Sequence, residues 1–376
     1  MRKTKKILRV VIPIIISLIF ISLFIIRMIK RDNNLTKTNT NTITKTFEGG
    51  EDIMVYYIDI GAIDGVPGEA ALIKKGNVDI LVDSGQNTKQ TWTNLNSFLK
   101  EKITDKTIEY AILTHPDTDH IGEMHNIYNN YTVNYTIRYD GKGTSNTATT
   151  FESLASDKSK VTEVGSYSTT NDTYDLKIDE GLNLKFLNTK CYDITSEKGN
   201  TTVANAKSIV FVLEAYNTRI LFNGDAEAYQ ETNYRSLAGN VDIMKMGHHG
   251  SSNATTLDLL KAIDPEVVIA TNGDYLGNSY KHPTYEAISR VYEYDPFSFV
   301  YSVSGGSSGD EDLNKDGVIN YSDNLVDRNG TIDVVIKSDS YTLKRDGTTD
   351  SLIEMSSTDY WADRDSKYLA YSHKEK

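Results

Sequence analysis

Six residues, His115-Pro116-Asp117-Thr118-Asp119-His120, place two imidazoles and two carboxylates directly after the apolar run Tyr110-Ala111-Ile112-Leu113. Carboxylates packed this closely repel one another and take up protons unless a cation compensates their charge. A divalent ion supplies that charge, and its ligand field accepts histidine nitrogen and aspartate oxygen together. A solvated polar turn is the alternative, but a β-prone run followed by potential ligands occurs twice more in the chain.

The two recurrences are Arg219-Ile220-Leu221-Phe222-Asn223-Gly224-Asp225 and Val241-Asp242-Ile243-Met244-Lys245-Met246-Gly247-His248-His249-Gly250-Ser251-Ser252. Helix-like segments follow the three runs, at about 121–128, 226–237 and 255–263. Strand, ligand loop and helix in this order are typical of an α/β protein with its chemistry on the loops at strand ends. We therefore expect the three strand ends to gather their ligands at one rim.

Taken together, these motifs resemble a known group, the metallo-β-lactamase superfamily, and within it the hydrolase domain found at the end of ComEC/Rec2-type competence proteins. The combined spacing is specific, whereas any one motif alone is weak. The resemblance covers about 53–343 and implies an α/β fold, the metallo-β-lactamase-like αβ/βα four-layer sandwich. The residues that carry it are His115-x-Asp117-x-Asp119-His120 followed by Ile121-Gly122, Asn223-Gly224-Asp225, Gly247-His248-His249-Gly250-Ser251, and two opening strands, Tyr57-Ile58-Asp59-Ile60-Gly61 and Ile80-Leu81-Val82-Asp83-Ser84-Gly85.

The resemblance implies a centre of two divalent metal ions, zinc or manganese, with seven candidate ligands: His115, Asp117, Asp119, His120, Asp225, His248 and His249. His115 and Asp117 would hold the first ion, and Asp225 would bridge the two ions. The wider superfamily usually supplies another histidine to the first ion, but the corresponding region here, 205–210, offers an Asn and a Ser. We therefore expect a first site that is weaker, partly occupied, or filled by a harder ion such as manganese.

The second ion would take Asp119, His120 and one of the adjacent histidines, His248 or His249. A water held between two such ions loses a proton near neutral pH, and the resulting hydroxide attacks the substrate. Asp119 would act as a catalytic residue that orients this hydroxide. His282 is the other expected catalytic residue, which would bind substrate or protonate the leaving group. A purely structural histidine before Pro283 is the alternative.

Other acidic residues are expected to support the site. Asp59 and Asp83 lie at strand ends and are predicted to hold the ligand loops by hydrogen bonds without touching metal. The loop at 61–70 is longer than the short Gly-Gln-Gly-Asp turn usual in the family. Either Asp64 or Glu69 would take the position of the family's aspartate.

The function expected from these residues is metal-dependent hydrolysis of a phosphoester, nuclease-like or by a phosphodiesterase, through a metal-bound hydroxide. Another ester, a lactone or an amide is the alternative substrate, and a non-catalytic surface binding protein on the same fold is the alternative class. The formal net charge of -12 leaves little surplus Lys and Arg to neutralise phosphates. Nucleic acid therefore stays open as a substrate, without a strong basic binding surface, and no protein partner is predicted.

The amino end joins a basic leader, Met1-Arg2-Lys3-Thr4-Lys5-Lys6, to an apolar run at 7–28. A helix of about twenty apolar residues crosses the hydrocarbon core of a bilayer. Because no cleavage-site pattern follows, residues 1–31 are expected to form a cytoplasmic leader and a single-pass transmembrane signal anchor, not a removed signal peptide. The polar segment 32–52 is expected to be a flexible linker, with the hydrolase domain, 53–345, outside the cell.

An insertion in this domain, at about 306–329, contains the spacing of a calcium loop. Gly317 stands at the position of the tight turn. A solvated acidic turn is the alternative. Five residues would supply the calcium ligands: Asp312, Asn314, Asp316, Val318 and Asp323.

Three further features carry weaker predictions. Segment 139–173 is rich in Gly, Ser, Thr and Asn without a strong period, so we expect a loop there. Residues 346–376 form a mixed-charge tail. The only cysteine is Cys191, so the chain has neither an intrachain disulfide framework nor a cysteine-based zinc site.

Overall fold

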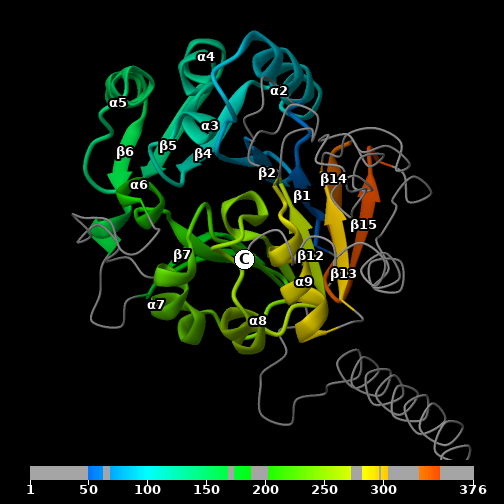
Figure 1. Ribbon diagram of the computed structural model, residues 1–376. Helices are drawn as coiled ribbons and strands as arrows, with labels where there is room; N and C mark the ends of the chain where they lie inside the picture. Colours follow the sequence, from blue (N-terminus) through cyan, green and yellow to red (C-terminus); the bar gives the residue numbers. More distant parts are fainter. Residues whose placement is uncertain are drawn as a thin grey trace, which may run out of the picture. The chain divides into compact units, whose positions relative to one another are not determined.

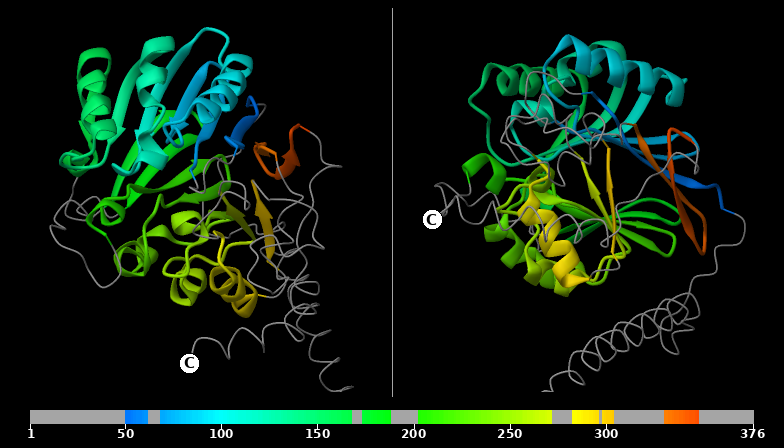
Figure 2. Two further views of the ribbon diagram at one scale, coloured as in Figure 1. Left: turned by 45° about the horizontal axis from the view of Figure 1, so that its top comes forward. Right: turned by 45° about the vertical axis from the view of Figure 1, so that its right-hand side comes forward.

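Two β-sheets face each other, and helices cover their outer surfaces (Figure 1). The computed structural model describes residues 50–61, 68–167, 173–187, 202–271, 282–295, 298–303 and 330–347. Within these residues the order of layers is helices, sheet, sheet, helices, and Figure 2 shows the same order from two further sides. The expected αβ/βα sandwich is therefore confirmed.

The first sheet has eight strands among the described residues, in the order β15-β14-β1-β2-β3-β4-β5-β6. Strands β3 to β6 are parallel to one another, whereas β1, β2, β14 and β15 pair antiparallel. Strand β1 lies between β2 and β14, and Ile53 pairs with Ile336. The strands are β1 (Ile53–Tyr57), β2 (Ala71–Lys75), β3 (Val78–Val82), β4 (Thr107–Leu113), β5 (Thr132–Arg138), β6 (Lys160–Glu163), β14 (Ile332–Ile336) and β15 (Tyr341–Arg345).

The second sheet has seven strands in the described part of the chain, in the order β13-β12-β11-β10-β9-β8-β7. Strands β10 to β13 are parallel, and β7 to β10 are antiparallel. The strands are β7 (Thr173–Asp179), β8 (Leu182–Leu187), β9 (Val210–Ala215), β10 (Thr218–Phe222), β11 (Ile243–Lys245), β12 (Val267–Ala270) and β13 (Phe299–Ser302).

The longer helices divide between the two outer faces (Figures 1 and 2). Helices α2 (Lys89–Lys102), α4 (Met124–Asn130) and α5 (Asn146–Lys158) pack on the first sheet. Helices α7 (Ala228–Ala238), α8 (Leu257–Ile263) and α9 (Tyr285–Tyr294) pack on the second. Two short helices, α3 (Thr118–Ile121) and α6 (Val203–Ala206), lie in loops beside the site described below.

Alternation along the strands creates three apolar layers. In β1, Ile53, Val55 and Tyr57 face the second sheet, whereas Tyr56 faces the outer layer that contains Leu95 of α2. Successive side chains of a strand point to opposite faces, so one strand contributes to two layers. Each fully buried side chain of this size contributes about 1.5–3 kcal/mol. This packing fixes the strand ends from which the site is built.

Two predicted segments differ from the structure. The helix expected at 121–128 is divided into α3 and α4, because the N–H of Gly122 donates to the carbonyl of Gly85 (2.9 Å) and not to its own helix. A Cβ at Gly122 would lie 2.2 Å from the backbone nitrogen of Asn87, so the close approach requires glycine.

The loop expected at 139–173 contains α5 and β6, so that prediction was wrong. Three small or aromatic residues of α5, Ala148, Phe151 and Ala155, are buried at helical spacing. The Ser145 side chain caps the helix by accepting from the N–H of Ala148. The many polar residues on the solvent face of α5 made this row of buried residues hard to recognise in the sequence.

Several predictions fall outside the described residues: the membrane span at 7–28, most of the linker, the calcium loop with Asp312 to Asp323, Asp64, Cys191 and most of the tail. Where the structure is described, none of the helices combines the length and apolar character needed to cross a bilayer.

Candidate metal centre

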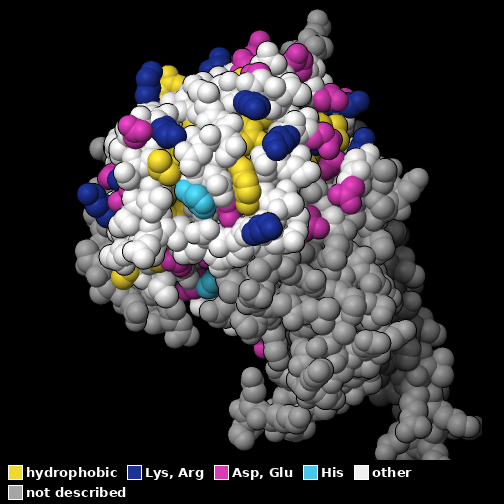
Figure 3. All heavy atoms as spheres, turned by 90° about the horizontal axis from the view of Figure 1, so that it is seen from above, with side chains coloured by type: hydrophobic (Ala, Val, Ile, Leu, Met, Phe, Trp, Pro, Cys, Tyr) yellow, Lys and Arg dark blue, Asp and Glu magenta, His cyan; other side chains and the backbone are white. Residues whose placement is uncertain are grey.

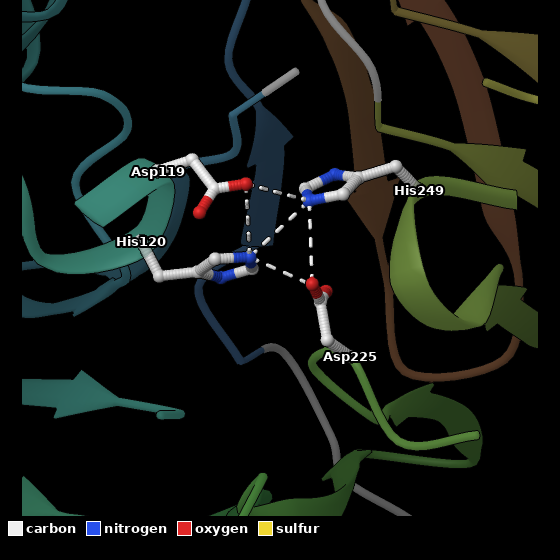
Figure 4. Close-up of side chains that lie close together, drawn as sticks. All are labelled: Asp119, His120, Asp225 and His249. Carbon is white, nitrogen blue, oxygen red and sulfur yellow. Dashed lines mark hydrogen bonds and ion pairs between the residues drawn. The ribbon is translucent and has the colours of Figure 1, made fainter. Parts of the chain in front are cut away.

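Four side chains converge at the rim where β4, β10 and β11 end (Figure 4). The Nε2 atom of His120 lies 3.2 Å from Oδ1 of Asp225 and 3.2 Å from Nε2 of His249. The latter nitrogen lies 3.4 Å from Oδ2 of Asp119 and 3.5 Å from Oδ2 of Asp225. One ligand atom from each of the four residues lies within 4.8 Å of all the others. Both sheets therefore contribute to one cluster, as the strand-end pattern predicted.

Hydrogen-bond partners determine which nitrogen of each imidazole faces the cluster. Nδ1 of His249 lies 2.8 Å from the carbonyl oxygen of Thr271, which can only accept, so this nitrogen carries the proton. Nδ1 of His120 likewise donates to Oδ2 of Asp83, at 2.8 Å. Both Nε2 atoms then face each other at 3.2 Å beside two carboxylates, so a proton or a metal ion must lie between them. Such a donor set repels itself unless a cation lies between its members, and it fits zinc or manganese.

A second set of side chains borders the same Asp225 carboxylate. Its Oδ2 atom lies 3.6 Å from Nε2 of His115 and 3.6 Å from Nε2 of His248. Nε2 of His115 also lies 3.7 Å from Oδ2 of Asp117, whose side chain is 46% exposed. This buried nitrogen of His115 has no hydrogen-bond partner in the described part of the chain. A buried polar atom without a partner is costly, and a metal ion would satisfy it.

Charges within the cluster shift its titration. Burial alone would raise the pKa of Asp225, but the nearby imidazoles of His120 and His249 lower that pKa well below its usual range. Burial opposes the charged form of His120, yet Asp225 and Asp83 raise its pKa well above the usual value. Burial and then His120 lower the pKa of His115. In the metal-free protein, a proton on His120 therefore stands where a cation would stand, and metal binding would release it.

Asp83 holds the first ligand loop, as predicted. It is fully buried and accepts hydrogen bonds from the N–H of Thr114 (2.8 Å) and the hydroxyl of Thr114 (2.8 Å), as well as from His120. The same hydroxyl lies 3.0 Å from Nδ1 of His115. Because the Thr114 hydroxyl donates to Asp83, it accepts from His115, and Nε2 of His115 is left facing the cluster.

Glu69 lies beside the cluster of Asp119, His120, Asp225 and His249, in a buried ion pair with Lys245. Its Oε2 is 2.7 Å from Nζ of Lys245 and accepts a hydrogen bond from the Thr271 hydroxyl at 2.6 Å. Its carboxylate oxygens also lie 3.7 Å from Nδ1 of His120 and 3.5 Å from Nδ1 of His249. Glu69 is therefore the carboxylate of the opening loop that the structure places beside the site.

The sequence alone did not single out Lys245, Thr271 or Glu227. A lysine inside the apolar run 243–246 was the one visible sign, because a charge there needs a buried partner. Lys245 also donates to the carbonyl of Gly224 at 2.8 Å, next to Asp225. Glu227, only two residues beyond Asp225, lies 2.9 Å from Nδ1 of His248.

His282 lies beside the two adjacent histidines His248 and His249, called the tandem histidines below. Its ring centroid is 5.4 Å from that of His248 and 6.3 Å from that of His249. Burial, followed by these two neighbours, lowers the pKa of His282 to about 3, so its ring is neutral at neutral pH. The backbone N–H of Thr284 donates to the carbonyl of Gly250 (2.8 Å) and so ties this segment to the ligand loop. The structure thus brings His282 to the site, and its catalytic role stays a prediction.

A family model described as the metallo-beta-lactamase superfamily matches residues 63–271, more than half of the 376-residue chain. The chain belongs to this superfamily. It is similar to Recombination protein 2 of Haemophilus influenzae, with 26% identity over 247 residues, covering 65% of this chain and 28% of that protein. It is also similar to Competence protein ComA of Neisseria gonorrhoeae, with 33% identity over 90 residues, 23% of this chain and 13% of that protein.

These curated relatives are much longer than this chain. The aligned part spans 28% of Recombination protein 2 and 13% of ComA. Among solved structures, the metallo-beta-lactamase fold protein YhfI from Bacillus subtilis aligns with a TM-score of 0.39 at 14% identity, covering 58% of this chain and 86% of that chain. The competence-type relationship inferred from the motifs is therefore confirmed by the sequence relatives.

Proposed function

We propose that the chain is a metal-dependent hydrolase that acts on phosphoesters. The observation that carries this proposal is the cluster of Asp119, His120, Asp225 and His249, in which two imidazole Nε2 atoms face each other at 3.2 Å between carboxylates. A protein that kept the fold for binding alone would have no physical need for this arrangement. Superfamily members are mostly metal-dependent hydrolases, which supports the same conclusion.

Bound divalent ions would lower the pKa of a water molecule and stabilise negative charge on the ester oxygen. The residues of the chain then divide the remaining work. Asp119 is 18% exposed, and its Oδ2 borders His249, so it can accept a hydrogen bond from the attacking water and fix the direction of attack. Neutral His282 can hydrogen-bond a substrate oxygen. The half-exposed Asp117 marks the side on which solvent and substrate reach the centre.

A phosphodiester is the substrate class we favour, because the sequence relatives are named for recombination and competence. The net charge of -12 argues against extended contact with a nucleic acid backbone. Figure 3 supports this for one face, where Lys and Arg are interspersed with Asp and Glu over the helices of the first sheet. The ester would therefore be bound mainly at the metal centre. Another ester, a lactone or an amide is the alternative substrate.

We further propose that the apolar run at 7–28 anchors the enzyme in the cell membrane, with the hydrolase domain outside.

The full-length chain, purified with detergent, tests the proposed activity in a metal-resolved screen. Chelated protein would be supplied with manganese or zinc and offered bis(p-nitrophenyl) phosphate, p-nitrophenyl phosphate, a lactone and a β-lactam. Turnover of the diester, restored by either metal, is the expected result. Metal binding without turnover of any substrate would instead support the non-catalytic binding protein.

Replacing Asp119 with Ala tests the role of that residue. Because Asp119 would orient the attacking water and is also a candidate metal ligand, turnover should fall at least about a hundredfold. The melting temperature should fall no further than it does when metal is removed from the unchanged chain. Asp157→Asn, on the exposed face of α5, is the matched control that removes a carboxylate far from the site. Full activity of Asp119→Ala would remove the proposed role.

A further inference from the structure

One of the tandem histidines can replace the histidine that the first ion lacks. No histidine lies between His125 and His248, so the region that usually supplies one cannot do so. The structure places Asn205 there, but its amide nitrogen donates to Oε1 of Glu227 at 2.9 Å. Asn205 therefore supports Glu227, and the carboxylate of Glu227 in turn holds Nδ1 of His248 at 2.9 Å.

The backbone separates the two side chains of the pair. His248 (φ 47°, ψ 53°) and His249 (φ 54°, ψ 17°) both adopt the left-handed conformation, which costs non-glycine residues about 1–3 kcal/mol each. Their ring centroids lie 6.1 Å apart with an interplanar angle of 61°. Two consecutive strained residues thus hold two imidazoles in different orientations, with both Nε2 atoms within 3.6 Å of Oδ2 of Asp225.

All four imidazoles around Asp225 share one arrangement. In each ring Nδ1 is held by a fixed acceptor and Nε2 faces the centre. The acceptors are the Thr114 hydroxyl for His115, Asp83 for His120, Glu227 for His248 and the Thr271 carbonyl for His249. Second-shell hydrogen bonds of this kind set the tautomer of metal-binding histidines.

We propose that the tandem histidines divide between the two ions, with His248 as a ligand of the first and His249 as a ligand of the second. Each ion then receives two histidines and one aspartate of its own, and Asp225 serves both. Oδ2 of Asp225 lies within 3.6 Å of Nε2 of His115, His248 and His249 alike, so this oxygen does not separate the tandem histidines. The other ligands do: Nε2 of His249 lies 3.2 Å from Nε2 of His120 and 3.4 Å from Oδ2 of Asp119, and the cluster of ligand atoms within 4.8 Å of one another contains His249 but not His248. This inference rests on the proposed two-metal centre.

Metal stoichiometry in paired variants tests the division without using activity. The full chain would be equilibrated with manganese, and bound metal would be counted by mass spectrometry and by electron paramagnetic resonance. His248→Ala should lower the content from two ions to one and abolish the spin coupling of a manganese pair. Adding Asp117→Asn should cause no further loss, because the same ion is affected. Adding Asp119→Asn should remove the remaining ion.

The reverse result would overturn the proposal: in the His248→Ala background, Asp117→Asn removes the remaining ion and Asp119→Asn does not. Unchanged binding of two ions by His248→Ala would also overturn it. The remaining ion reports that the variant is folded, and His248 is 24% exposed on its side chain, so truncation leaves a gap that solvent can fill. His249→Ala is the matched control. Adding Asp119→Asn to it should cause no further loss of metal, whereas adding Asp117→Asn should remove the remaining ion.

Anomalous diffraction from manganese-soaked crystals of the unchanged chain gives a second measurement, which does not depend on the folding of any variant. One peak should lie within about 2.3 Å of Nε2 of both His115 and His248. A His248 nitrogen remote from both peaks would refute the division. A chain that binds no metal contradicts the proposed function itself, whereas a chain that binds two ions in this way but hydrolyses nothing leaves the division intact.

Discussion

The two loops that carry histidines, 114–120 after β4 and Gly247–Gly250 after β11, are stabilised in different ways. Loop 114–120 is held by the end of the neighbouring strand β3 in its own sheet. Asp83 accepts from Thr114 and His120, and the N–H of Ser84 donates to the carbonyl of His120 at 2.6 Å. Its backbone enters a helical turn with ordinary dihedral angles.

The loop Gly247–Gly250 contains two left-handed histidines and is held by side chains from distant segments. Glu227 holds His248, and the guanidinium of Arg290 in α9 donates to the carbonyls of Ser252 (2.9 Å) and Ala254 (2.6 Å) just beyond the loop. The first loop is therefore formed by local spacing and one strand end, and the second by tertiary contacts that impose strain. Strain of this kind persists only where the surroundings over-determine it.

Removing the group shared by both loops should have the largest effect. Asp225→Asn keeps the size of the side chain but removes the charge that both ligand sets border. Loss of several kcal/mol of charge stabilisation corresponds to a fall in turnover of about a thousandfold or more. Phosphodiester assays and metal counting on the same sample measure it. Retention of both ions would show that the loops do not depend on a common carboxylate.

The buried pair of Lys245 and Glu69 should show the next largest effect, on stability. Lys245→Met leaves Glu69 as an uncompensated charge, which typically costs about 3–5 kcal/mol of unfolding free energy. Both residues are at most 5% exposed, so solvent cannot replace the lost partner. The double variant with Glu69→Gln should recover most of the loss. Denaturant unfolding measures both, and equal stability of Lys245→Met and the unchanged chain would contradict the assignment.

Metal removal should destabilise the strained loop more than the other. An ion present at a hundred times its dissociation constant stabilises the native state by about 2.7 kcal/mol, so chelation should lower the melting temperature by roughly 5–10 °C. Hydrogen exchange should then increase more in Gly247–Gly250 than in 114–120, because only the former gains by relaxing its backbone. Equal exchange in both loops would argue against stored strain.

The smallest effects are expected from the two carboxylates that orient the histidines. Asp83→Asn and Glu227→Gln are matched substitutions that preserve shape, and each should weaken metal binding about 10–100-fold. Asp83→Asn should weaken most the ion bound by His120, to which Asp83 bonds directly, and Glu227→Gln the ion bound by His248. Calorimetric titration resolves two affinities. If both substitutions weaken the same ion, His120 and His248 do not belong to separate ions.

The sequence predicted the strand, ligand and helix order at all three strand ends, because hydrophobic period and ligand type are local properties. The ends of β4, β10 and β11 bring the other six candidate ligands around Asp225. It also predicted Asp83 as a support. These residues are recognisable from their neighbours in the chain.

Features that depend on distant partners were not predictable in this way. The division of α3 from α4 depends on a carbonyl of Gly85, and the burial of Lys245 depends on Glu69, 176 positions earlier in the chain. The separation of His248 from His249 depends on a backbone conformation that no local pattern signals. Spacing identifies candidate ligands, whereas tertiary contacts decide which atoms they present.

The pairing of Ile53 with Ile336 has a consequence for biogenesis. A nascent chain that has reached residue 303 already contains every candidate ligand of the metal centre, but one edge of β1 still lacks the strand β14. Contacts between segments so far apart form slowly, and an open strand edge can pair with another molecule meanwhile. Truncation before β14 should therefore yield aggregates, and translation must pass β14 before the native topology becomes accessible.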